Sequence, residues 1–288
     1  MLQNHKTLKF GSLNSFELSI SHLKPENFPL EDEPPLHIHD AFEIYLNLSG
    51  NISFIVENHT YPISRGSVII TKPYEYHHCV CHDNKEHEHY WLLFSGCEGN
   101  DMFKSFFERK KGENNHIILN NENVRILTDS FEKLINPSSD SHTEKYLHFI
   151  NVLNIIENNM SCTESENTYS IPEPLKKVLD IISEKYSEPL TVSGLASEIY
   201  VSVTTLERYF KQYLNITPCE YIKRKSLSEA MHMLSNHSAT VSQVALQCGF
   251  SDVSNFIRVF KRSFGKTPYR YIVGSKNNEI QKRYSGKT

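Results

Sequence analysis

The chain of 288 residues has no long hydrophobic run and no cysteine framework. No apolar stretch approaches the roughly 20 residues that a membrane-spanning helix needs, and the first residues do not have the charged-then-apolar pattern of an export leader. The six cysteines are scattered, which argues against a disulfide-linked secreted scaffold: they are Cys79, Cys81, Cys97, Cys162, Cys219 and Cys248. We therefore expect a soluble, cytoplasmic protein that makes no contact with a membrane.

Charge is distributed unevenly along the chain, although the total is only −4. Residues 1–170 contain 13 Lys and Arg against 24 Asp and Glu, a net −11, whereas residues 171–288 contain 17 against 10, a net +7. Thirteen of the 15 histidines also lie in the first part. A basic module beside an acidic one predicts a polyanionic partner for the second part alone.

The pattern of apolar residues also divides the chain. Residues 10–95 contain short apolar runs broken by turn residues, and in "FEIYLNLSG" Phe42, Ile44 and Leu46 alternate with polar neighbours, as in a half-buried strand. Helical spacing follows at 123–135 and 143–158, and again from Leu175 to about Tyr271. We predict an α+β chain of two domains, with a β-sandwich or small β-barrel in a domain at 1–160, a linker at 161–174 and an all-α domain at 175–288.

The second half contains an internal repeat. "FKQYLNITPCEYI" (210–222) and "FKRSFGKTPYRYI" (260–272) share Phe, Lys, Thr, Pro, Tyr and Ile at an offset of fifty residues. Upstream of each lies a short amphipathic helix, a turn with a serine (Ser202 or Ser251) suited to cap the next helix, and a second helix. A helix, a short turn and a helix with a basic outer face is the arrangement of a helix-turn-helix unit, and two such units can contact major grooves roughly 34 Å apart. The segment 226–236 is predicted to be the helix that spaces them.

These repeats resemble the tandem helix-turn-helix domain of the AraC/XylS regulators over roughly residues 175–273. The expected DNA-contacting residues are Ser202, Thr204, Glu207, Arg208, Lys211, Ser251, Val253, Ser254, Asn255, Arg258, Lys261 and Arg262. Arginine suits guanine and lysine suits phosphate. The sequence departs from the family pattern at Asn215, where glycine is usual, and at Glu207, which places an acid on the first recognition helix.

In the first half, "HIHDAFEIYLNLSG" resembles the first cupin motif, which implies a cupin-like barrel. The second motif is looser, with Glu75 where glycine is common and either His77 or His78 as the final histidine. Residues 37, 39, 43 and 45 share one face of a strand, so we expect an effector pocket in the barrel formed by His37, His39, Glu43, Tyr45 and His77. Metal-bearing cupins use the same positions for iron, manganese or zinc, but regulators of this family usually keep the motif without metal. We therefore predict no metal and no cofactor.

The segment "HHCVCHDNKEHEH" (77–89) holds five histidines and two cysteines. It is interpreted either as a polar turn between strands or as a site that senses metal or redox state.

Together these features predict a ligand-responsive bacterial transcription regulator that is not an enzyme. It would bind double-stranded promoter DNA and a small-molecule effector, with a sugar favoured by the resemblance, and would form a homodimer. The helices at 123–135 and 143–158 resemble the packing and dimerisation helices of the family; packing against the barrel is the competing use, above all for the first helix. Contact with RNA polymerase stays open, as do the choice between activation and repression, the operator and the effector. The alternatives are a metal- or redox-sensing regulator that uses 77–89, and a metal-dependent cupin enzyme joined to a DNA-binding module.

Overall fold

A computed structural model describes residues 5–9, 17–24, 39, 41–57, 59–82, 87–95, 104–139, 141–160, 171–214, 216–235 and 239–272. The chain folds as two compact units, Met1–Tyr169 and Ser170–Thr288. Among the helices in the described ranges, none has the length and apolarity to cross a bilayer. The predicted linker at 161–174 lies mostly outside the described residues, and its limits stay a prediction.

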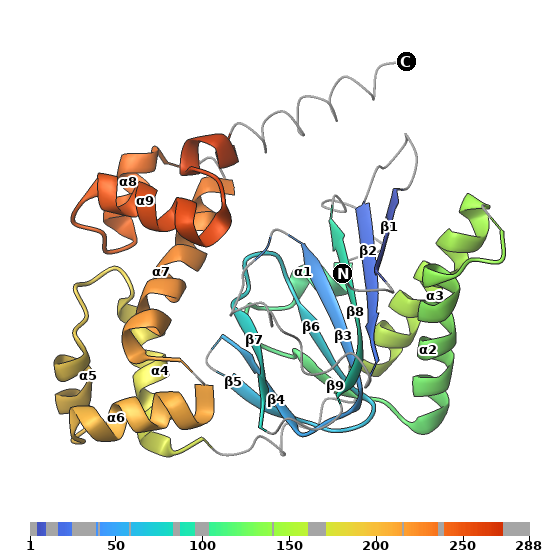
Figure 1. The fold of residues 1–288 in the computed structure, drawn as a ribbon, viewed down its shortest axis with the longest axis horizontal. Helices are drawn as coiled ribbons and strands as arrows, with labels where there is room; N and C mark the ends of the chain where they lie inside the picture. The colour runs from blue at the N-terminus through green and yellow to red at the C-terminus, as the bar shows by residue number, and fades with distance from the viewer. Residues whose placement is uncertain are drawn as a thin grey trace. The chain divides into compact units, whose positions relative to one another are not determined.

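The first unit consists of two antiparallel sheets followed by helices (Figure 1). The larger sheet has the order β1-β2-β8-β3-β6-β9 and the smaller one the order β5-β4-β7. The strands are β1 (His5–Lys9), β2 (Glu17–Leu23), β3 (Phe42–Ser49), β4 (Ile52–Val56), β5 (His59–Ile63), β6 (Ser67–Thr71), β7 (His77–Cys81), β8 (Glu88–Ser95) and β9 (His116–Ile118). The helices of this unit are α1 (Lys104–Glu108), α2 (Asn121–Ile135) and α3 (His142–Asn159).

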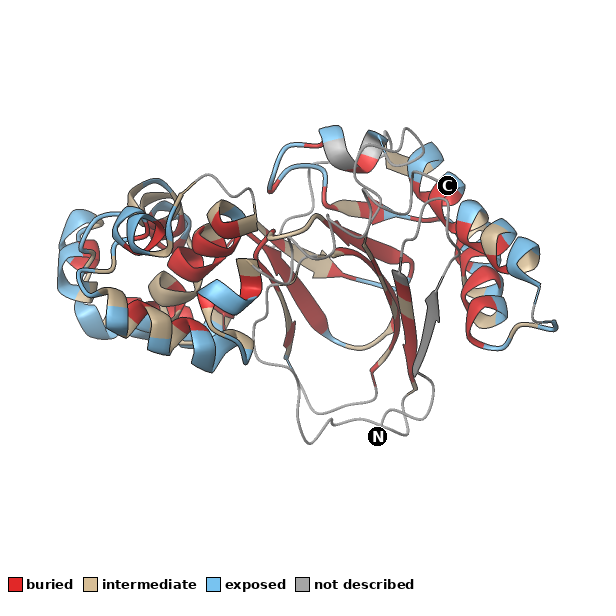
Figure 2. Ribbon diagram, turned by 90° about the horizontal axis from the view of Figure 1, so that it is seen from above, coloured by how far each residue is buried: buried red, intermediate tan, exposed pale blue. Residues whose placement is uncertain are grey.

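Alternation along β3 assigns each face of the larger sheet to a different core. Phe42, Ile44 and Leu46 join one apolar cluster with residues of α2 and α3, so these helices cover the outer face of the sheet. Tyr45, on the opposite face, joins a second cluster with residues of β4, β5 and β6. Figure 2 shows the buried residues concentrated on the strands and on one side of each helix. The predicted period of two is therefore present, but the strand is buried on both faces and not half-buried as its alternation indicated. Its inner face points into the interior between the two sheets, which we call the lumen.

The second unit is entirely helical within its described residues. It contains α4 (Glu173–Lys185), α5 (Val192–Glu198), α6 (Val203–Tyr209), the short π-helix η4 (Phe210–Leu214), α7 (Pro218–Ser235), α8 (Val241–Gln247) and α9 (Val253–Phe264). The pairs α5–α6 and α8–α9 are the two predicted helix-turn-helix units. Phe210 and Phe260 are fully buried at matching positions of the repeat. The shared aromatic positions therefore hold the core of each unit together.

Some local expectations were wrong. Ser202 caps α6, but Asp252 and not Ser251 caps α9, because its carboxylate accepts from the backbone N–H of Ser254 and Asn255. The spacer helix α7 begins at Pro218 and not at residue 226, because the "TPCEYI" segment of the first repeat is its first turn. The short elements β1, α1 and β9 were not predicted.

The apolar face of α3 also differs from the expected one. Helical spacing predicts an apolar stripe through Leu147, Ile150 and Leu153, widened by Ile155 and Ile156. Leu153, Ile155 and Ile156 are buried together with Phe149 and Val152, but the first two residues of the stripe are not. Leu147 and Ile150 are exposed, at 55% and 41% of their surface. They therefore form an apolar surface that the first unit does not cover.

Candidate functional site

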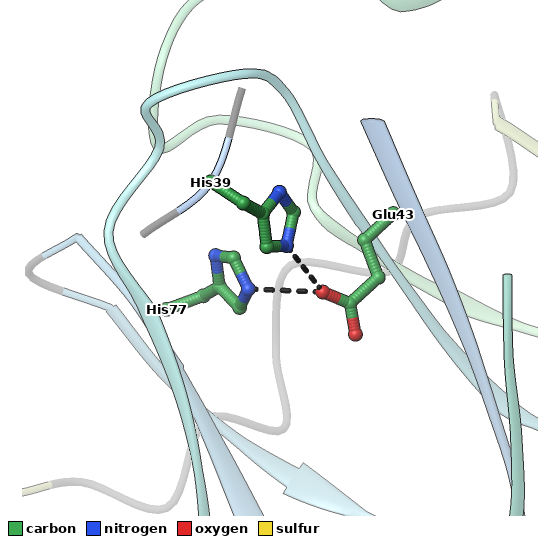
Figure 3. A group of neighbouring side chains, drawn as sticks. All are labelled: His39, Glu43 and His77. Atoms are coloured by element: carbon green, nitrogen blue, oxygen red, sulfur yellow. Dashed lines mark hydrogen bonds and ion pairs between the residues drawn. The ribbon is translucent and has the colours of Figure 1, made fainter. Parts of the chain in front are cut away.

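Three polar side chains meet inside the barrel at one end of the lumen (Figure 3). His39 precedes β3, Glu43 lies in β3 and His77 begins β7. The Nε2 atoms of His39 and His77 lie 3.0 and 2.9 Å from the same carboxylate oxygen, Oε2 of Glu43. The first contact is a hydrogen bond, whereas the second is an ion pair whose N–H direction is poorly aligned on the oxygen. Glu43 and His77 are buried, so this charge cluster is shielded from solvent.

The backbone fixes both imidazole rings. Nδ1 of His39 donates to the carbonyl of Ala41 over 3.0 Å, and Nδ1 of His77 donates to the carbonyl of Glu75 over 2.7 Å. Each Nε2 is therefore the atom left to meet Glu43. Burial opposes charge on both Glu43 and His77, but their mutual attraction prevails: the pKa of Glu43 is held well below its ordinary value and the pKa of His77 is raised. Both shifts favour the charged forms, a Glu43 carboxylate beside a His77 imidazolium.

The same atoms have the chemistry of metal ligands. Among the described residues, His39, Glu43 and His77 are a group whose ligand atoms all lie within 4.8 Å of one another. Two imidazoles and a carboxylate suit a first-row divalent metal, and ligating histidines commonly donate their other N–H to a backbone carbonyl, as both do here. The cluster can therefore be held together either by protons or by a cation.

Further along the lumen, Tyr45 connects to two more histidines. Its hydroxyl oxygen lies 2.7 Å from Nε2 of His87, and its ring stacks on His89 with centroids 4.6 Å apart. Four of the five predicted pocket residues thus lie on the inner side of this unit or at its rim. His37, the fifth, lies outside the described residues.

Sequence reasoning missed a buried ion pair beside the cluster. The Glu75 carboxylate accepts two bonds from the Arg109 guanidinium, of 3.1 and 2.7 Å, and further bonds from the backbone N–H of Lys72 and Gly112. Glu75 had been noted only as a departure from the usual glycine. Its role is to fasten the loop after α1 to the turn that carries His77. No local signal pairs residues 34 positions apart.

In the second unit, the predicted DNA-contacting residues lie on and around α6 and α9. Ser202, Thr204, Glu207, Arg208 and Lys211 are exposed around α6. Around α9 the exposed residues are Ser251, Ser254, Arg258, Lys261 and Arg262, whereas Val253 and Asn255 are half-buried. Arg258 donates to the Asn255 side chain over 2.9 Å, which orients its guanidinium along the helix surface. Each unit thus presents one arginine, Arg208 or Arg258, two residues before its buried phenylalanine.

Comparison with known proteins supports both halves. A family model described as the AraC-like ligand binding domain matches residues 27–147, and a helix-turn-helix domain model matches residues 195–272. The chain is 26% identical over 254 residues to the HTH-type transcriptional activator RhaS from Escherichia coli O81 (strain ED1a) and from Shigella sonnei (strain Ss046), covering 81% of this chain and 86% of each relative.

Solved structures also match. An AraC-type DNA-binding domain protein from Chromobacterium violaceum is 30% identical over 35% of this chain and 91% of that chain, with a TM-score of 0.34. ToxT from Vibrio cholerae O395 is 15% identical and covers 90% of this chain and 97% of that chain, with a TM-score of 0.37. With a ligand-binding domain model ahead of a helix-turn-helix model, and relatives that match across both, the chain belongs to the AraC family of ligand-responsive transcription regulators.

Proposed function

We propose that the barrel lumen binds a polar small molecule, a sugar in the favoured case, through His39, Glu43, Tyr45 and His77. The observation that carries the proposal is the buried cluster in which two imidazoles share one carboxylate oxygen. A hydroxyl group can both donate and accept, so a polyol could insert between these groups and satisfy each of them. Tyr45 and two further histidines, His87 and His89, extend the polar lining beside this cluster.

Binding changes DNA affinity only if the ligand prefers one state of the protein. A hydroxyl that separates His77 from Glu43 alters the starts of β7 and β3, and β3 packs on α2 and α3 through its other face. We propose that this strand carries the signal. The ligand acts without being transformed, and we assign no enzymatic activity to the cluster.

We propose that α6 and α9 enter successive major grooves of promoter DNA, with Arg208 and Arg258 on guanine and Lys211 and Lys261 on phosphate. Such a protein works in the cytoplasm on chromosomal DNA. The exposed Leu147 and Ile150 of α3 provide the homodimer contact, since burying them against a second copy removes apolar surface from water. The relatives are titled transcriptional activators. Since an activator requires RNA polymerase, we propose RNA polymerase as a further partner.

One observation favours a second candidate function. Both rings of the cluster donate Nδ1–H to a carbonyl, the outer contact typical of metal ligands. A divalent cation bound by His39, Glu43 and His77 would make the protein a metal-responsive regulator. Elemental analysis of the purified chain separates the two candidates, because a stoichiometric metal that disappears in Glu43→Gln establishes the second.

The decisive experiment combines a ligand screen with DNA binding. Thermal unfolding of the whole chain is measured against a panel of sugars, and each stabilising sugar is then added to a fluorescence-anisotropy titration on promoter DNA. The proposal predicts at least one sugar that raises the melting temperature and shifts DNA affinity, and predicts that both effects are lost in Glu43→Gln. Lys133→Gln, which alters an exposed ion pair on α2, is the matched control and keeps both. Stabilisation that persists in Glu43→Gln would place the ligand elsewhere.

A further inference from the structure

A second cluster in the lumen consists of thiols and imidazoles. Cys79 and Cys81 lie on β7 at the same parity as His77, so the three side chains share the inner face of the strand. Both cysteines pack against the apolar cluster that includes Tyr45 and Phe54. His87, just before β8, and His89, in β8, are buried, whereas the two cysteines are half-buried. Four residues of the unusual segment 77–89 therefore face one interior.

Hydrogen bonds link these groups in a chain. The Sγ atom of Cys81 lies 3.9 Å from Nδ1 of His87, and Nε2 of His87 lies 2.7 Å from the Tyr45 oxygen. Cys79 packs against the same apolar cluster as Tyr45. When the Tyr45 oxygen accepts from Nε2–H of His87, the lone pair of Nδ1 faces Cys81. This tautomer is the one that can bind a cation on the side of Cys81.

His89 supplies an imidazole nitrogen that the protein leaves unsatisfied. Its Nδ1 is buried without a hydrogen-bond partner, and its ring centroid lies 4.6 Å from that of His87. Burial lowers the pKa of His87 to about 4 and holds the pKa of His89 well below its ordinary value. Burial therefore disfavours the charged form of both rings.

We propose that Cys79, Cys81, His87 and His89 bind one thiophilic cation, with Zn²⁺ as the ion. Two thiolates and two imidazoles are a donor set that zinc takes in four-coordinate sites. With Zn–S near 2.3 Å and Zn–N near 2.0 Å, neighbouring S and N ligands lie about 3.5 Å apart in a tetrahedron. The contact of 3.9 Å between Cys81 and His87 is close to one edge of such a site. Among the described residues, the ligand atoms of His39, Glu43 and His77 already lie within 4.8 Å of one another, whereas Cys79 and His89 have to move inward to complete the second site.

Binding releases protons. Each thiol loses its proton when sulfur bonds the ion, so one Zn²⁺ and two thiols give a zinc dithiolate and two protons that pass to solvent. Tyr45 then serves as the outer hydrogen-bond partner of His87. This site differs in chemistry from the cluster of His39, Glu43 and His77, which offers no sulfur. It exists whether or not the lumen takes a sugar, so its test does not depend on the proposed function.

Cobalt distinguishes the two clusters. The whole chain, purified with reduced thiols and stripped of metal, is titrated with Co²⁺, because thiolate ligation produces a sulfur-to-cobalt charge-transfer band in the near ultraviolet and imidazole or carboxylate ligation does not. We expect the band to reach its maximum at one Co²⁺ per chain and to disappear when Zn²⁺ is added. The band should persist in Glu43→Gln, which alters the other cluster. It should also persist in Cys219→Ser, because the exposed thiol of Cys219 lies in the second unit. Tyr45→Phe should weaken binding by about 10–100-fold.

Wild-type protein provides a test that does not rely on a variant folding. Zn²⁺ should protect two thiols from alkylation, and peptide mass spectrometry should identify them as Cys79 and Cys81. A missing charge-transfer band overturns the proposal. So does a band that survives in a folded Cys79→Ser/Cys81→Ser variant, or protection of cysteines other than these two.

Discussion

Tyr200 and Gly249 occupy the same position in the two helix-turn-helix units, and both have left-handed backbone, with φ of 59° and 79°. In each unit the residue after this one donates its N–H to a carbonyl five residues earlier, from Val201 to Ala196 and from Phe250 to Ala245. These are the bonds of a Schellman turn, which favours glycine at this position. The first unit therefore makes the turn of the second with a strained and almost fully exposed tyrosine.

Replacing this tyrosine should stabilise the protein. A left-handed backbone costs a residue with a side chain roughly 1–2 kcal/mol, and Tyr200→Gly removes this cost from the folded state. Glycine also adds conformational entropy to the unfolded state, so we expect the free energy of unfolding to rise by a net of roughly 0.5–1 kcal/mol. Gly249→Ala is the matched opposite change, because its Cβ would lie 2.9 Å from the carbonyl oxygen of Tyr186, and it should destabilise. Calorimetry of the whole chain measures both, and a lower melting temperature for Tyr200→Gly would contradict the expected strain.

The buried pair of Glu75 and Arg109 should dominate the stability of the first unit. Glu75→Gln leaves the guanidinium buried opposite a neutral amide, and we expect a loss of roughly 3 kcal/mol in the free energy of unfolding. Lys110→Ala, which removes a surface pair of 3.8 Å with Glu113, should cost well under about 1 kcal/mol. Urea unfolding followed through Trp91, the single tryptophan, reports on this unit.

The same pair predicts a pH dependence. Burial alone would raise the pKa of Glu75, but the bonds from Arg109 outweigh it and lower the pKa below its ordinary value. Its contribution is therefore complete above the ordinary glutamate pKa and is lost as pH falls through the folded-state value. Wild type should lose more stability than Glu75→Gln between pH 7 and acid pH. Parallel pH profiles for the two proteins would show that Glu75 does not titrate in this way.

Arg258 and Lys261 should affect DNA binding differently. We expect Arg258→Ala to cost roughly 1–3 kcal/mol and to relax preference at one base pair, because arginine contacts two acceptors of guanine. Lys261→Ala should weaken binding to all DNA sequences alike and reduce the slope of log affinity against log salt concentration by about 1. Selection of sites from random DNA at two salt concentrations separates these outcomes. Arg258→Ala that binds more weakly with unchanged preference would make Arg258 a phosphate contact.

The exposed residues of α3 should determine the oligomeric state. Leu147→Glu combined with Ile150→Glu places two charges on the surface that we assign to the homodimer, and should give a monomer at micromolar concentration in sedimentation equilibrium. Leu246→Glu alters an equally exposed leucine of α8 and should leave the dimer intact. A monomeric wild type, or a dimeric double variant, would rule out this interface.

Periodic patterns made most of the architecture predictable from the sequence. A strand repeats every two residues, so the faces of β3 followed directly from Phe42, Glu43 and their neighbours. The repeated segment gave both helix-turn-helix units for the same reason. Contacts between residues far apart in the sequence leave no such pattern. Glu75 and Arg109 come into contact only when the loop after α1 has folded back onto the turn before β7.

Local competition explains other errors. Ser251 and Asp252 are both good caps, and the geometry of the preceding turn selects the second. Tyr200 has no intrinsic preference for positive φ, so only its alignment with Gly249 could have revealed the turn. The apolar face of α3 was misassigned because its apolar residues surround much of the helix, and only the packed sheet shows which of them it covers.

The alternation of β3 also limits how this domain can change. Glu43 and Tyr45 face the lumen, while Phe42 and Ile44, at the alternate positions, pack beneath the helices. Substitutions at the odd-numbered positions of β3 can therefore change which ligand the lumen binds without disturbing the packing of α2 and α3. Deletion of a single residue early in β3 would turn every later side chain to the opposite face and damage both layers together. Within this strand, new ligand preferences can arise by exchange of side chains but not by a change in length.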